Sequence, residues 1–154
     1  MNSAVRMLDR SAEKYKSKIF AIHGDESVTF SGLRETALAL ASGILLRSTP
    51  ESHRAPVFVF LPKGIAALAS FMGSMYAACP YVPVDTGMPL DRLGKIIDNL
   101  KPGLIITDEA RVSDIAAISP SGCAVCSYNE LTETAVDEDS VYAVLDTVVD
   151  SDPI

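Results

Sequence analysis

The sequence predicts an α/β protein with a doubly wound, mostly parallel sheet covered by helices on both faces. Apolar runs that do not alternate with polar residues, at 56–61 and 104–107, are typical of strands buried on both faces. Segments with helical periodicity separate such runs, so strand and helix alternate from residue 56 to residue 127. The 154 residues, of which 48% are hydrophobic and 21% charged, are sufficient for one domain with a real core.

A short helix and a hairpin are expected at the N-terminus. Ser3 is a suitable N-cap for a helix whose apolar residues recur every three or four positions: Val5, Leu8, Ala12 and Tyr15. Residues 19–23 and 28–30 are predicted as two short strands around the turn Gly24–Ser27.

A long helix is expected after the hairpin, with Ser31 as its cap and its end in the polar, proline-containing segment 48–52. The apolar face of this helix comprises Leu33, Ala37, Leu40, Ala41, Ile44 and Leu45.

The alternating part of the chain contains a helix rich in Ala, Leu and Met, predicted to be well buried, and a helix with Pro89 at its first position and Asp91 in its first turn. The second helix has an apolar side of Leu90, Leu93, Ile96, Ile97 and Leu100. In chain order the predicted elements are a strand at 56–61, a helix at 65–78, a buried strand at 81–84, a helix from 89 to 100, a strand at 104–107, a weaker helix at 109–118 and a short strand at 123–127.

Charge and composition divide the chain into two predicted parts. Residues 1–128 form the α/β unit, and residues 129–154 form an acidic connector with one strong apolar cluster, 141–149, expected as a last strand or helix. No Lys or Arg follows Arg111, whereas nine of the 20 acidic residues do. The net charge of −7 is therefore mainly a property of the C-terminal third.

Several protein classes are disfavoured by these patterns. A nucleic-acid-binding surface needs clustered Lys and Arg side chains, and neither part of the chain offers such a cluster. The longest apolar stretches fall short of the ~20 residues of a membrane span, and no secretory signal is visible. An odd number of cysteines, three, without an export signal suits a reducing cytoplasm, so we expect a cytoplasmic protein.

The tests for a chemical motif are negative. The nine glycines never fall in GxGxxG or GxxxxGK[ST] order, and no GxSxG elbow exists to activate a serine. Cys123 and Cys126 match CxxC, but zinc needs four ligands, and residues three apart on a strand point to opposite faces. We therefore interpret both cysteines as core residues, and His23 and His53 as structural or solvated. No catalytic, cofactor-binding or metal-ligating residue is predicted in this chain.

Asp85 is the best single functional candidate, because parallel sheets bind ligands at the carboxyl ends of their strands. The favoured alternative is structural: its carboxylate accepts backbone N–H bonds in the turn before the Pro89 helix. Asp91 and Arg92 are interpreted first as a helix-start acid and an ion-pair partner, with direct ligand contact as the less favoured alternative.

The stretch YVPVDTGMPLDRLGKIIDNLKPGLIITD, residues 81–108, resembles a signature block of the adenylate-forming enzymes, the superfamily of acyl-CoA synthetases, luciferases and peptide-synthetase adenylation domains. VTFSGL at 28–33 and the segment 56–78 are similar to two further blocks of this family. The VPVD and PLDR forms are most similar to amino-acid-activating members, namely nonribosomal peptide synthetase adenylation domains and D-alanine:carrier-protein ligases. The family commonly has a glycine just before the aromatic strand, where this chain has the residues AACP at 77–80, and this departure loosens the subfamily assignment. The matched structural positions are Tyr81, Val82, Pro83, Asp85, Pro89, Arg92, Ile96 and Ile97.

The resemblance implies that the chain is the N-terminal scaffold of an ATP-dependent ligase. Such an enzyme uses ATP and magnesium to convert a carboxylic acid, here an amino acid, to an acyl-adenylate, and passes the acyl group to the thiol of a carrier-protein phosphopantetheine or of CoA. Its partners include the remainder of the adenylation domain. The family's phosphate loop, TSGSTGxPKG, and its catalytic lysine do not occur here, so this chain alone is expected to be inactive. The alternatives are a stand-alone, non-catalytic α/β interaction module or a fragment of an acyl-CoA synthetase.

Overall fold

The computed structural model describes residues 4–49, 52–149 and 152. The expected capping residue Ser3 lies outside them. The elements, in chain order, are α1 (Ala4–Lys14), β1 (Ile19–His23), β2 (Glu26–Thr29), α2 (Phe30–Arg47), β3 (Val57–Phe60), α3 (Ile65–Tyr76), β4 (Tyr81–Pro83), α4 (Leu90–Leu100), β5 (Leu104–Thr107), the 3₁₀ turn η2 (Glu109–Arg111), α5 (Val112–Ile118), β6 (Ala124–Ser127), α6 (Tyr128–Thr132) and α7 (Glu138–Leu145).

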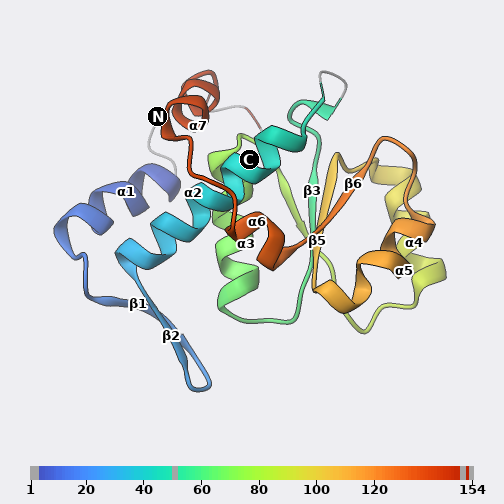
Figure 1. Ribbon diagram of the computed structural model, residues 1–154, viewed down its shortest axis with the longest axis horizontal. Coiled ribbons are helices and arrows are strands. Elements are labelled where there is room, and N and C mark those ends of the chain that lie inside the picture. The colour runs from blue at the N-terminus through green and yellow to red at the C-terminus, as the bar shows by residue number, and fades with distance from the viewer. Residues whose placement is uncertain (1–3, 50–51, 150–151, 153–154) are drawn as a thin grey trace.

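The central feature is a four-stranded parallel sheet in the order β4-β3-β5-β6, which confirms the predicted fold class (Figure 1). The chain steps from β3 to β4 through α3, and then returns past β3 to β5 through α4. This reversal makes the carboxyl ends of β3 and β5 a topological switch point, where doubly wound proteins bind ligands. The β1–β2 hairpin forms a separate antiparallel pair.

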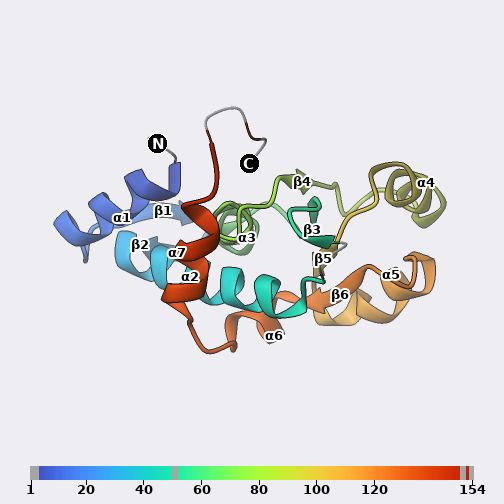
Figure 2. The ribbon, with the colours of Figure 1, turned by 90° about the horizontal axis from the view of Figure 1, so that it is seen from above.

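Helices cover both faces of the sheet. Figure 2 shows α4 and α5 on one face and α2, α3 and α6 on the other, with α1, α7 and the hairpin packed farther out on the α2 side. Alternate residues of β3 enter different cores: Phe58 and Phe60 pack towards α4 and α5, whereas Val57 and Val59 pack towards α2 and α3. All four residues of β3 are buried, as an unalternating apolar run predicts.

Strand β4 differs from the prediction of a buried strand. Among the described strands it pairs only with β3, so it is one of the two edge strands of the sheet, and Tyr81 is 36% exposed. An edge strand tolerates Pro83, because its outer side needs no backbone N–H for pairing. The apolar composition of this segment thus reflects a half-covered edge.

Helix α2 begins two residues earlier than predicted. Thr29, and not Ser31, is its N-cap, and the Thr29 hydroxyl accepts the N–H of Gly32 at 3.1 Å. Ser31 instead donates its hydroxyl hydrogen to the carbonyl oxygen of Lys16 at 2.8 Å, which ties the turn after α1 to the start of α2. Likewise, Pro89 is the N-cap of α4 and not its first helical residue.

The acidic segment after residue 128 contains two helices that pack on the body. Leu131 of α6 and Val141 and Leu145 of α7 are at most 1% exposed. The apolar cluster predicted as a strand or helix is therefore helical at its start. Helix α2, enclosed by α3 on one side and by α6 and α7 on another, is buried all along 37–44, a wider face than its periodicity indicated.

Candidate functional site

The turn between β4 and α4 borders the switch point at the carboxyl edge of the sheet. Asp85 orders this turn: its Oδ1 accepts the N–H of Gly87 at 2.8 Å, and its carbonyl oxygen accepts the N–H of Met88 at 3.0 Å. This is the favoured structural interpretation of Asp85. Its second carboxylate oxygen, Oδ2, accepts no hydrogen bond from the residues that the structure describes.

A hollow of about 600 Å³, here called the α3-side hollow, lies between this turn and the start of α3. Most of its wall is apolar, and Lys63 and Asp85 both border it. Its volume lies within the ~300–1,000 Å³ of typical small-molecule sites. The lining residues are Val59, Leu61, Pro62, Lys63, Gly64, Ala67, Leu68, Phe71, Pro83, Val84, Asp85 and Thr86.

A smaller hollow of about 210 Å³ lies on the other side of the same turn, against α5. Arg111 is held there by three contacts. Its guanidinium lies 5.3 Å from the centre of the Phe60 ring, its Nη1 donates to the Thr86 carbonyl oxygen at 3.3 Å, and its Nε is 3.4 Å from Asp108. Sequence reasoning did not single out Arg111, because its role depends on two segments that meet only in the fold.

The signature residues of the β4–α4 segment are not brought together at one point. Tyr81 stacks on Phe71 with ring centres 4.6 Å apart, at the edge strand. Asp91 and Arg92 are exposed on the first turn of α4. Among these residues, only Pro83 and Asp85 line the α3-side hollow.

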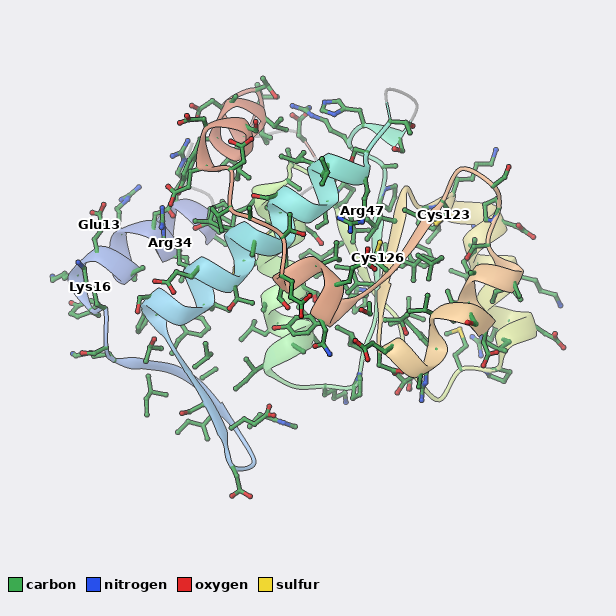
Figure 3. The ribbon with its side chains drawn as sticks, viewed as in Figure 1. Glu13, Lys16, Arg34, Arg47, Cys123 and Cys126 are labelled. Atoms are coloured by element: carbon green, nitrogen blue, oxygen red, sulfur yellow. The ribbon has the colours of Figure 1, made fainter. Side chains whose placement is uncertain are left out.

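Cys123 and Cys126 lie at β6, as Figure 3 shows, and belong to different cores. Their opposite-face placement agrees with the spacing argument. Burial raises the pKa of the Cys123 thiol to about 11 and also raises that of Cys126, so neither is a ready thiolate. Burial likewise raises the pKa of Cys79 to about 11.

A polar network that the sequence did not predict joins α1, α2, α3 and α7. One oxygen of Asp9, Oδ1, accepts hydrogen bonds from the Tyr76 hydroxyl at 2.6 Å, the Tyr142 hydroxyl at 2.8 Å and Nε of Arg34 at 2.9 Å. Arg34, labelled in Figure 3, also donates to both carboxylate oxygens of Glu138, at 3.0 and 3.3 Å. The one sequence feature that could have indicated this network is the position of Asp9 in α1. Asp9 follows the buried Val5 by four residues and so lies beside the apolar stripe of the helix.

Burial and the hydrogen bond to Asp9 raise the pKa of the Tyr76 hydroxyl far above its ordinary value of 10.0. The same two causes raise the pKa of Tyr142. Both phenols are therefore neutral donors to the Asp9 carboxylate, which suits a structural network and not a proton-transfer site.

Neither a metal-ligand cluster nor a glycine-rich phosphate loop occurs among the residues that the structure describes. No group of three or more His, Cys, Asp or Glu side chains within the described ranges could hold a metal ion. The carboxyl edge also lacks the run of glycine N–H groups with which phosphate loops bind nucleotides. No helix in the described part of the chain is long and apolar enough to cross a membrane.

Comparison with known proteins identifies relatives that are much longer than this chain. It is 33% identical over 115 residues to a D-alanine--D-alanyl carrier protein ligase of Bacillus velezensis, a match that covers 75% of this chain and 20% of that protein. It is 30% identical over 120 residues to a dimodular nonribosomal peptide synthase of Bacillus subtilis, covering 77% of this chain and 5% of that protein. The chain thus spans a fifth or less of these two relatives.

Solved structures with the same fold include a benzoate CoA ligase from Burkholderia xenovorans, with a TM-score of 0.74 and 20% identity over 86% of this chain and 28% of that one. The NpsA N-terminal subdomain of Klebsiella oxytoca matches with a TM-score of 0.70 and 15% identity, over 86% and 32% of the two chains. The family model described as AMP-binding enzyme matches residues 8–153. The chain belongs to the AMP-binding, adenylate-forming enzyme family and corresponds to its N-terminal part.

Proposed function

We propose that this chain is the N-terminal scaffold of an ATP-dependent ligase that activates an amino acid as an acyl-adenylate and transfers it to a carrier-protein thiol. The observation that carries the proposal is the 33% identity to a D-alanine--D-alanyl carrier protein ligase over three quarters of the chain. The peptide-synthase match supports the same amino-acid class. The VPVD and PLDR segments, which resemble those of amino-acid-activating members, lie at the sheet edge and the start of α4.

The scaffold role is consistent with the chemistry of the described residues. Adenylate formation requires groups that stabilise charge on the transferring phosphoryl group. Lys63 and Arg111 are cations at the carboxyl edge, but Arg111 is already bound to Asp108 and Thr86, and neither lies in a glycine-rich loop. In this proposal the sheet supports the catalytic part of the enzyme, with the remainder of the adenylation domain and a carrier protein as partners.

ATP–pyrophosphate exchange tests the proposal. The longest polypeptide that contains this sequence should catalyse exchange with an amino acid, D-alanine among the first to try, whereas residues 1–154 alone should not. Exchange that is driven only by fatty or aromatic acids would replace the amino-acid ligase by an acyl-CoA synthetase. No exchange with any acid from a folded, full-length protein would favour a non-catalytic module and contradict the proposal.

A further inference from the structure

The α3-side hollow has the composition of a small-ligand site. Its walls are formed by aliphatic and aromatic side chains, among them Leu61, Leu68 and Phe71, and it opens at the carboxyl ends of β3 and β4. Apolar pockets of this size that carry a few polar groups are the usual form of small-molecule sites. The polar groups therefore decide which molecule would fit.

Lys63 and Asp85 supply opposite charges at this hollow. The ammonium group of Lys63 has no hydrogen-bond or ion-pair partner among the described residues. Asp85 uses one carboxylate oxygen for the Gly87 N–H and leaves the other oxygen without a partner in the same part of the chain. The two side chains border one hollow without forming an ion pair with each other.

This arrangement discriminates by charge. A ligand with only a carboxylate would be attracted by Lys63 and repelled by Asp85. A ligand with only an ammonium group would be attracted by Asp85 and repelled by Lys63. A ligand with both groups satisfies both side chains, and an apolar substituent on it can cover Leu61, Leu68 and Phe71. A free α-amino acid with an apolar side chain has these three parts.

We propose that the α3-side hollow binds an apolar α-amino acid, with its carboxylate towards Lys63, its ammonium group towards Asp85 and its side chain on the apolar wall. This goes beyond the proposed function and does not depend on it, because both charged residues lie in the present chain. Since the two charges are solvent-exposed, we expect a Kd in roughly the millimolar range.

NMR titration of residues 1–154 labelled with ¹⁵N tests this site with three matched probes: L-leucine, 4-methylpentanoate without the amine, and 3-methylbutylamine without the carboxylate. Leucine should shift the backbone signals of Gly64 and Gly87 saturably. Each one-charge probe should bind at least tenfold more weakly. Equal binding of leucine and either one-charge probe would overturn the proposal, as would no saturable shift with leucine.

Two substitutions locate the binding. Lys63→Met keeps the apolar stem, and Asp85→Asn keeps an acceptor for the Gly87 N–H, so both variants should fold, as thermal unfolding can verify. Each should weaken leucine binding at least tenfold. Lys95→Met and Asp98→Asn, exposed on α4 and outside this hollow, are the matched controls and should bind normally. Unchanged affinity in both site variants would contradict the assignment even if the ligase activity proposed above is found.

Discussion

At the residue scale, the Asp9 network is the least predictable part of the molecule and one of the most consequential. Its members come from positions 9, 34, 76 and 142, so no local pattern reveals it. Tyr76, at 0% exposed, would leave a buried hydroxyl unsatisfied without Asp9 and the carbonyl oxygen of Val5. Asp9 therefore lets a tyrosine be fully buried between α1 and α3.

Replacement of Asp9 by Asn should destabilise the protein. The amide has the same size as the carboxylate but lacks its negative charge, and the carboxylate accepts three hydrogen bonds. A hydrogen bond to a charged group contributes about 1.5–3 kcal/mol to stability. We expect the free energy of unfolding, from urea denaturation, to fall by about 2–3 kcal/mol. Asp98→Asn on the exposed side of α4 is the control and should change it by less than about 0.5 kcal/mol. An equal effect of both substitutions would show that the network contributes nothing specific.

Tyr76 should make the protein sensitive to alkali. Its folded pKa is raised above the unfolded value of about 10, so its contribution is fully present below pH 10 and is lost as the pH rises further. Above pH 10, the free energy of unfolding should fall by up to about 1.4 kcal/mol more per pH unit because of this one proton. Unfolding free energies between pH 8 and 11 check this, and Tyr76→Phe should flatten the curve above pH 10. An identical slope in the variant would contradict it.

At the scale of elements, the sequence predicted the types of most helices and strands, since periodicity reports burial directly. The unalternating runs at β3 and β5 are strands buried at every position. The wrong predictions concern features that depend on the tertiary structure around an element. Strand β4 has the same apolar character as β3 and β5 but lies at the edge of the sheet. Whether Thr29 or Ser31 caps α2 depends on the residue at which the β1–β2 hairpin ends and the helix begins.

The most extensive contact between two helices of the described chain, that of α2 with α3, was also not predictable from either helix alone. A β-carbon at Gly73 would lie 2.6 Å from Cβ of Leu40, so the two helices approach closely because this residue is glycine. Gly94 in α4, by contrast, has no atom within 4 Å of such a β-carbon.

These two glycines form a matched pair for mutagenesis. Gly73→Ala should destabilise the protein by about 1–3 kcal/mol, because α2 and α3 must separate. Gly94→Ala should stabilise it by up to about 1 kcal/mol, because alanine is the better helix former. Thermal or urea unfolding measures both. The interpretation of Gly73 would be wrong if its variant gained stability as the Gly94 variant does.

At the scale of the whole molecule, α6 and α7 integrate the acidic segment into the fold. The division at residue 128 and the connector role of 129–154 stay predictions, whereas the helices in that segment bury apolar side chains against α2. Arg6 and Arg34 add ion pairs to Asp146 and Glu138. What periodicity could not reveal was this packing, since it depends on where the segment returns in space.

Removal of residues 129–154 should therefore destabilise the fold strongly. Loss of buried Leu131, Val141 and Leu145 should lower the free energy of unfolding by on the order of 5 kcal/mol, at about 1.5–3 kcal/mol for each side chain. Circular dichroism during urea denaturation of the truncated and intact chains provides the measurement. Unchanged stability of the truncated chain would establish 129–154 as a mere connector.

The three donors to Asp9 also order events during synthesis. Asp9 and Tyr142 are separated by 133 positions, so the ribosome must release nearly the entire described chain before the last donor reaches the carboxylate. Before Tyr142 has been synthesised, Arg34 and Tyr76 are the only members of this donor set that Asp9 can bind. The Asp9 carboxylate therefore gains its last donor only after most of residues 4–149 have been synthesised.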